Sequence, residues 1–237
     1  MGEWNIRREG PIAILSMDDG KANTVLVGEF DGLGKALKEL AASDASAVVL
    51  TGRPGYFSAG LNLKVMPTLP NPELQKLITR FGEVVIDLFV FPKPIVAAVS
   101  GHALGAGAIF GFCSDVRLFA EGPFKYGLNE VPGGLFVPTF GIISARSAVP
   151  SQHLTQLILH GRVFSPTEAL QLGVAESLHA PDALLPAAIG RAKQLAELGG
   201  SGYAYTKQLL RGAMAEEARV GLPKEVAHLA TALGGKK

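Results

Sequence analysis

The chain has 237 residues, of which 48% are hydrophobic and 18% are charged, and its formal net charge is +1. This composition supports a sizeable buried core and excludes an intrinsically disordered chain. Lysine and arginine are scattered along the sequence, which argues against a nucleic-acid partner or an anionic membrane surface.

The sequence offers little for redox or metal chemistry. Cys113 cannot form an internal disulfide, and a small buried thiol is a simpler interpretation than a nucleophile. His153 and His160 have no third ligand at a suitable spacing, so we expect no metal site. We find no signal peptide, no apolar stretch long enough to span a membrane, and no recognisable address at 235–237. A cytoplasmic protein is therefore expected.

The first half of the chain predicts strands that alternate with helices. Short uncharged β-prone runs predict strands, and apolar residues at steps of three and four predict helices. The expected strands are 4–8, 12–17, 47–51, 95–100 and 116–120, and the first two flank Gly10-Pro11 and predict a hairpin. The expected helices are 26–40 and 74–85. We expect a loop at 52–60 and a turn into a helix at 101–111. The alternation favours βαβ units and a mostly parallel sheet.

The second half of the chain is predominantly helical by the same criteria. The expected helices are 151–160, 165–171, 183–198, 203–214 and 224–233. The helix at 165 begins with Ser165-Pro166-Thr167-Glu168, which has the cap residue, the first-turn proline and the glutamate of a capping box. The sequence therefore predicts an α/β core followed by a helical tail.

Two glycine-bearing segments, 53–64 and 100–108, follow buried strands. Small residues let the backbone approach a ligand, and the free N–H groups of a helix start can hold negative charge. The same glycines can also simply make tight strand-to-helix turns. Gly105 and Gly107 begin like a dinucleotide fingerprint, but Phe110 occupies the next required glycine position. The sequence has no phosphate loop and no nucleophile elbow, so an NAD enzyme, an NTPase and a serine hydrolase lose their main support.

A third segment, 126–134, carries the carboxylate of Glu130 among apolar, glycine and proline residues. A glutamate in a loop is commonly a solvated surface charge. In an apolar cleft, however, desolvation would raise its pKa and make it a useful proton shuttle.

Taken together and in order, the three segments resemble the enoyl-CoA hydratase/isomerase (crotonase) superfamily. Residues 57–63 are similar to the first family signature, with Asn62 where Asp is usual, residues 97–107 are similar to the second, and residues 165–174 are similar to a later helix and turn. The resemblance implies an α/β fold of the ClpP/crotonase type, with a spiral of ββα units at 1–190. It also implies a helical C-terminal region at 191–237 that mediates trimerisation, giving a homotrimer or a dimer of trimers.

The resemblance also implies roles for individual residues. The backbone N–H groups of Leu61 and Ala106 would form an oxyanion hole for the thioester oxygen, and Glu130 would be the acid–base carboxylate. The other substrate-binding positions would be Ala59, Gly60, Asn62, Leu63 and Asn129. Lys21 and Lys64 would contact the CoA phosphates, or they are simply solvated. Met66, Leu135 and Phe136, together with Leu63, would line the acyl pocket, or they belong to the core.

The number of carboxylates predicts the reaction. Hydratases of this family use two glutamates; the first would fall at Ile109, where it is absent, and the second falls at Glu130. A double-bond shift needs only one base, which moves a proton from C2 of a 3-enoyl thioester to C4. Residues 53–61 and 127–130 also resemble the 3,2-enoyl-CoA isomerase branch. The sequence therefore predicts such an isomerase, which needs no cofactor because coenzyme A is part of the substrate.

Two alternatives stay open. The same fold and CoA site can serve another reaction, such as hydration, thioester hydrolysis or a biosynthetic double-bond shift, although Ile109 counts against hydration. A catalytically idle homologue could instead act as a binding or assembly subunit, although Glu130 within its motif counts against this.

Overall fold

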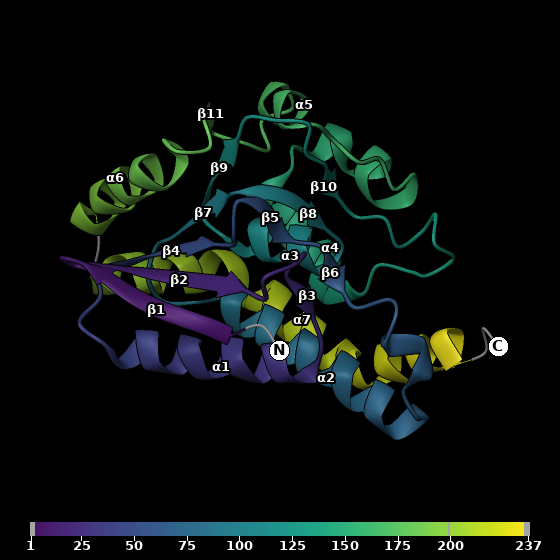
Figure 1. The fold of residues 1–237 in the computed structure, drawn as a ribbon. Helices are drawn as coiled ribbons and strands as arrows, with labels where there is room; N and C mark the ends of the chain where they lie inside the picture. Colours follow the sequence, from purple (N-terminus) through teal and green to yellow (C-terminus); the bar gives the residue numbers. More distant parts are fainter. Residues whose placement is uncertain (1–2, 199, 235–237) are drawn as a thin grey trace.

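A six-stranded sheet in the order β1-β2-β4-β7-β9-β11 runs through the molecule (Figure 1). The computed structural model describes residues 3–198 and 200–234. The predicted hairpin is confirmed, because β1 and β2 pair antiparallel, whereas the other neighbours in this sheet are parallel. The strands are β1 (Glu3–Glu9), β2 (Ile12–Asp18), β4 (Ala47–Thr51), β7 (Ile95–Val99), β9 (Val116–Ala120) and β11 (Ser177–His179).

Helices cover both faces of this sheet, which is why β4 and β7 are buried throughout. On one face α6 (Leu184–Glu197) packs its apolar side against alternate residues of the central strands. On the other face α1 (Val27–Ala42) and α2 (Asn71–Phe89) close the larger core (Figure 1). The predicted strands and helices of this core are thus confirmed, with bounds that differ by a few residues.

Two small parallel sheets lie beside the large one. One has the order β10-β8-β5, formed by β5 (Gly55–Ser58), β8 (Gly101–Leu104) and β10 (Tyr126–Gly127). The other pairs β3 (Thr24–Val25) with β6 (Gly60–Leu61). The predictions of a loop at 52–60 and of a turn at 101–111 are therefore wrong in part. These strands are held by pairing between distant segments, which local periodicity does not reveal.

The chain repeats a strand–strand–helix unit. In each turn the first strand, β2, β4, β7 or β9, joins the large sheet, and a following strand joins a small sheet. A helix then closes the turn: α1, α2, α3 (Ala106–Cys113) or α4 (Thr139–Ala148). The expected spiral of ββα units is confirmed, although the sequence pattern missed α4.

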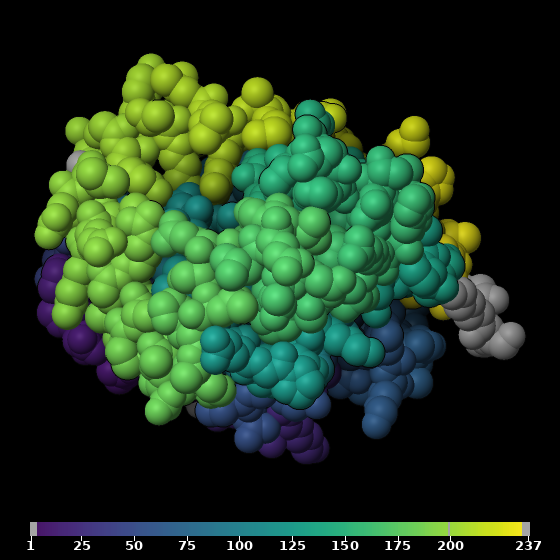
Figure 2. Space-filling view, turned by 90° about the horizontal axis from the view of Figure 1, so that it is seen from above, coloured from purple at the N-terminus to yellow at the C-terminus, as the bar shows by residue number. Residues whose placement is uncertain are grey.

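The helices after α4 lie over the top of the molecule and behind it. Figure 2 shows, from above, the green residues that follow α4 beside the yellow-green residues of α6 and the start of α7. The short elements here are the 3₁₀ turn η2 (Ser151–His153), the π-helical turn η3 (Thr155–Leu159) and α5 (Pro166–Gln171); another 3₁₀ turn, η1 (Met66–Thr68), precedes α2. The capping box of α5 is confirmed, because Ser165 Oγ accepts from Glu168 N and Glu168 accepts from Ser165 N.

The C-terminal helix α7 (Ser201–Gly234) is one continuous helix that contains Pro223. The prediction of two helices at 203–214 and 224–233 is wrong, because packing of α7 against α2 and α4 outweighs the hydrogen bond that proline removes. Of the expected C-terminal region, residues 199 and 235–237 lie outside the described part of the chain. Within residues 3–198 and 200–234, no helix is long and apolar enough to cross a membrane.

A buried ion cluster fastens α7 to the sheet. The carboxylate of Asp115, just before β9, forms ion pairs with Lys207 at 2.7 Å and Arg211 at 3.1 Å, both from α7. Arg211 also donates to the carbonyls of Phe89 and Cys113. Cys113 itself is fully buried, and burial raises the pKa of its thiol to about 12, which confirms an inert core residue.

Candidate active site

The two glycine-bearing segments of the sequence are packed directly against each other. A Cβ added to Gly107 would lie 2.0 Å from the carbonyl oxygen of Ser58, and one added to Gly101 would lie 2.0 Å from the carbonyl carbon of Gly55. Neither position can accept a side chain unless the backbone moves apart. The glycines therefore do more than make turns, because they let β5 lie against β8 and α3.

This packing places the first predicted oxyanion donor beside the second. Gly60, which precedes Leu61, has a φ of +83°, and a Cβ on it would lie 2.5 Å from Leu104 O and 3.2 Å from Ala106 N. The amide of Asn62 donates to β3. Because successive amides of an extended chain point to opposite sides, we expect the Leu61 N–H to face away from β3.

The second predicted donor belongs to the start of a helix. Ala106 is the first residue of α3, and the first intrahelical bond runs from Ile109 N to Gly105 O. The amides of Ala106, Gly107 and Ala108 therefore have no acceptor within the helix. Such N–H groups favour negative charge, including the charge that develops on a thioester oxygen when it becomes an enolate.

Glu130 lies beside this helix start. It follows β10, and its Oε1 is 3.3 Å from the position that a Cβ on Gly105 would take. Its Oε2 is buried and has no hydrogen-bond partner among the described residues. Burial raises the pKa of Glu130, against a smaller opposing effect of backbone N–H groups at 129 and 130. The arrangement suits a carboxylate that takes up and returns a proton.

The position where a second acid would be needed is apolar. Ile109 lies one turn into α3 and is fully buried. A Cβ on Gly141 of α4 would lie 3.0 Å from Ile109 Cδ1, so the two helices are closely packed at this point. The candidate site thus combines the carboxylate of Glu130 with the free amides at the start of α3, and we expect the amide of Leu61 beside them.

The residues around Leu61 are held by the loop that contains them. The amide of Ala59 donates to Ala22 O. Asn62 Oδ1 accepts from the amides of Lys64 and Val65 at 3.2 and 3.3 Å, which closes a turn. The side chain of Asn62 therefore shapes the loop, a role that Asp can fill in the same way. Asn129 is exposed, and its Oδ1 lies 3.7 Å from the Cβ position of Gly105, beside Glu130.

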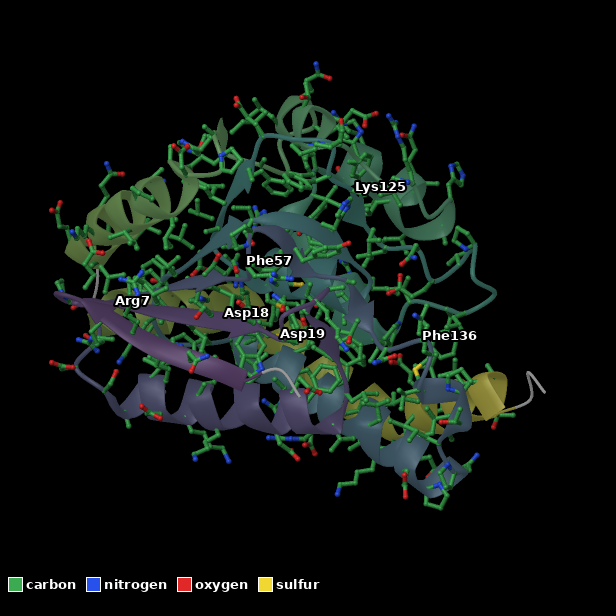
Figure 3. All side chains as sticks on the ribbon, in the orientation of Figure 1. Arg7, Asp18, Asp19, Phe57, Lys125 and Phe136 are labelled. Atoms are coloured by element: carbon green, nitrogen blue, oxygen red, sulfur yellow. The ribbon has the colours of Figure 1, made fainter. Side chains whose placement is uncertain are left out.

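The remaining predicted contacts differ in exposure. Lys21 and Lys64 are exposed on surface turns. Among the acyl-pocket candidates Met66 is buried, Leu135 is half-buried, and Leu63 and Phe136 are 64% and 37% exposed. Figure 3 places Phe136 on the side of the molecule where α2 begins. The structure thus does not gather these candidates into one enclosed pocket.

A cavity of about 580 Å³ borders the site, and sequence reasoning did not predict it. It reaches Leu104, next to the helix start, and Asn129, next to Glu130. Its other walls are Pro123, Phe124, Lys125, Val163, Phe164, Ser165 and Glu168. These residues come from two segments that are far apart in the chain, 123–125 and 163–168, and the second contains Ser165 and Glu168 of the α5 capping box.

Known proteins match most of the chain. The family model for enoyl-CoA hydratase/isomerase matches residues 7–230. The probable enoyl-CoA hydratase EchA17 of Mycobacterium tuberculosis is 32% identical over 151 residues, which cover 64% of this chain and 58% of that relative.

Solved structures share the whole fold. A crystal structure of an enoyl-CoA hydratase/isomerase family protein from Pseudomonas syringae has a TM-score of 0.89 at 26% identity, covering 95% of this chain and 97% of that one. A Mycobacterium tuberculosis protein, described as an enoyl-CoA isomerase in one structure and as a probable enoyl-CoA hydratase in another, is 27% identical. Its TM-score in the first is 0.87, with 94% of this chain and 97% of that one covered. With this fold, and with a match that includes all three segments of the site, the chain belongs to the enoyl-CoA hydratase/isomerase family.

Proposed function

We propose that this protein is a 3,2-enoyl-CoA isomerase, which shifts the double bond of a fatty acyl-CoA thioester. The observation that carries the proposal is the carboxylate of Glu130, whose Oε2 is buried beside the start of α3, with Ile109 where a second acid would stand. Hydration of a double bond has to activate water as well as move a proton, whereas isomerisation only moves a proton. Among similar proteins, one from Mycobacterium tuberculosis is described as an isomerase, although hydratase is the commoner description.

In the proposed reaction Glu130 takes a proton from C2 of the 3-enoyl thioester. The C3–C4 double bond and the thioester carbonyl then share the electron pair as a dienolate. The N–H groups of Leu61 and Ala106 stabilise the oxygen, by about 3 to 4 kcal/mol for each donor. Protonated Glu130 returns the proton to C4, which leaves the double bond between C2 and C3. Atoms and charge balance without a cofactor.

The test compares 3-hexenoyl-CoA and 2-hexenoyl-CoA as substrates for the wild type and for Glu130→Gln. Loss of the base is expected to lower kcat for isomerisation by about 10²- to 10⁴-fold. Unchanged isomerisation in the variant would contradict the role of Glu130. Hydration as fast as isomerisation would favour a hydratase, and intact CoA-ester binding without turnover would favour an idle homologue.

We also propose that the C-terminal region forms a trimer, because the resemblance to this family implies trimerisation through that region. Four large apolar side chains of α7 are exposed in the single chain: Tyr205, Leu209, Leu210 and Val220, at 67%, 67%, 72% and 74%. Exposed apolar side chains gathered on one helix are typical of an interface. Sedimentation velocity should show a trimer or hexamer, and Leu209→Glu together with Leu210→Glu should shift the protein towards monomer.

A further inference from the structure

Asn23 is fully buried in the turn between β2 and β3, and its φ is +52°. Few residues other than glycine adopt this backbone conformation, although asparagine tolerates it better than most. Such a backbone conformation persists only where contacts with the surrounding structure hold the residue in it. The proposed chemistry does not use Asn23 directly.

The side chain of Asn23 connects two parts of the core. Its Nδ2 donates to Met17 O at 2.8 Å, at the end of β2. The same group donates to Tyr56 O at 3.2 Å and to Phe57 O at 3.3 Å, both on β5. Its Oδ1 accepts from the amide of Asp19 at 3.0 Å.

The backbone of Asn23 extends the connection to the candidate site. Ser58 Oγ donates to Asn23 O at 2.7 Å, and Ser58 Oγ also accepts a hydrogen bond from Gly60 N at 3.1 Å. Ser58 is buried, and Gly60 is the residue before Leu61. Gly60 has no side chain and a positive φ, so this hydrogen bond acts together with the pairing of β6 and β3 to fix the direction of its peptide group. The next peptide group carries the N–H of Leu61.

The turn itself is held by a carboxylate. Asp19 accepts from the amides of Lys21 at 2.7 Å, Asn23 at 2.9 Å and Thr24 at 3.2 Å. Burial alone would raise the pKa of Asp19, but these N–H groups and the nearby Arg53 outweigh it and hold the pKa below its usual value. Asp19 is therefore ionised at neutral pH and keeps Asn23 in place.

We infer that Asn23 and Ser58 are positioning residues that fix the first oxyanion-hole donor, the N–H of Leu61. The inference rests on the proposed function, because it needs a thioester oxygen bound by Leu61 and Ala106. The hydrogen bonds run without a gap from Asp19 through Asn23 and Ser58 to Gly60. A displacement of about 1 Å at such a donor is enough to lower a rate about 100-fold.

The first test is Ser58→Ala, which removes one hydroxyl and leaves the backbone of Asn23 unchanged. We expect kcat to fall about 10- to 100-fold with a much smaller change in KM, since the donor acts mainly in the transition state. The matched control is Ser144→Ala. Ser144 is also fully buried and also bonds a backbone carbonyl, Gly141 O at 2.8 Å, but it has no connection to Gly60. A kcat loss that is equal in both variants would overturn the inference.

The second test does not depend on turnover. Bound hexanoyl-CoA labelled with ¹³C at the thioester carbonyl should show a lowered carbonyl stretching frequency in the infrared, because two N–H donors polarise the bond. This shift should shrink in Ser58→Ala and in Asn23→Gly, which keeps the positive φ but removes the side chain, and it should persist in Ser144→Ala and Glu130→Gln.

The outcomes separate the two proposals. A carbonyl shift in the wild type without isomerisation would overturn the proposed reaction and leave the positioning role standing. Isomerisation with an undiminished carbonyl shift in Ser58→Ala would overturn the positioning role alone. The absence of any shift in the wild type would overturn the oxyanion hole and, with it, the inference.

Discussion

The ammonium group of Lys207 lies 2.7 Å from the carboxylate of Asp115, in the interface between α7 and the sheet. Both side chains are almost completely enclosed, at 5% and 11% exposure, and Arg211 at 8% shares the same carboxylate. The Asp115 carboxylate thus compensates the buried positive charges of both Lys207 and Arg211. Burial lowers the pKa of Lys207, and the carboxylate of Asp115 opposes that effect.

Asp115→Asn should therefore destabilise the protein strongly. The amide keeps the shape of the carboxylate but leaves Lys207 and Arg211 as uncompensated buried charges, which costs about 3 to 5 kcal/mol. Urea unfolding at fixed protein concentration measures the loss. The control is Asp87→Asn, which breaks an exposed pair with Arg219 at 3.0 Å and should cost less than about 1 kcal/mol. Similar losses in the two variants would show that burial of the cluster does not matter.

Glu130→Gln should make the protein more stable at neutral pH while it lowers the rate of isomerisation. Since burial raises the pKa of Glu130, the folded protein holds this proton at pH values where the unfolded chain has lost it. The free energy of unfolding then falls as pH rises from the ordinary glutamate pKa through the raised one. Glutamine has no charge to bury, so the variant should lose this pH dependence.

The same raised pKa predicts the pH dependence of the rate. The base must be ionised, so kcat/KM of the wild type should fall on the acid side at a higher pH than an ordinary glutamate would give. Thermal unfolding between pH 4 and 8 and the rate profile should report the same group. An exposed control, Glu216→Gln, should change neither curve.

Gly107→Ala should prevent correct folding or abolish activity. Its Cβ would meet Ser58 O at 2.0 Å, so α3 and β5 would have to separate and the donors at Leu61 and Ala106 would move. The control is Gly190→Ala in α6, where nothing lies within 4 Å of the new Cβ. There alanine should stabilise the helix by about 0.5 to 1 kcal/mol. Melting temperature and isomerase rate, measured for both variants, provide the comparison, and a benign Gly107→Ala would contradict the close approach.

Glu225→Ala should weaken the junction between α7 and α4. Pro138, the residue before α4, cannot cap the helix with its side chain. Glu225 of α7 supplies the cap instead, because its carboxylate accepts hydrogen bonds from Thr139 N at 2.9 Å and from the Thr139 hydroxyl. Loss of such a cap costs about 1 kcal/mol. Glu216→Ala, exposed on the same helix, should be neutral in the same unfolding experiment. If both variants unfold alike, the cap contributes nothing.

The sequence predicted those parts of the fold that depend on local patterns. The hairpin around Gly10-Pro11, the buried strands β4 and β7, and the capping box of Ser165 and Glu168 each follow from residues close together in the chain. The strands β5, β6 and β8 did not, because each is only two to four residues long and exists through pairing with a distant segment. The predicted break between 214 and 224 was wrong for a similar reason, since tertiary packing keeps α7 continuous through Pro223.

For the candidate site, sequence reasoning selected the glycine segments and Glu130, and the structure shows why glycine is needed there. It did not select Asn23 or Ser58. The run Asp18-Asp19-Gly20-Lys21-Ala22-Asn23 indicates a turn by composition. That Asn23 also holds three carbonyl groups, two of them on β5, depends on a strand pairing that the chain order does not disclose.

The close approach at Gly60 and Gly107 has a consequence for how this site can diversify. The groups that would bind the thioester oxygen are peptide amides, so the side chains of Leu61 and Ala106 are free to change while the donors persist. Mutation can then replace the walls of the site, residue by residue, without passing through an intermediate that lacks the donors. Gly60 and Gly107 have to stay glycine, because they let the two backbones approach each other. Substrate preference can therefore change only through the residues around them.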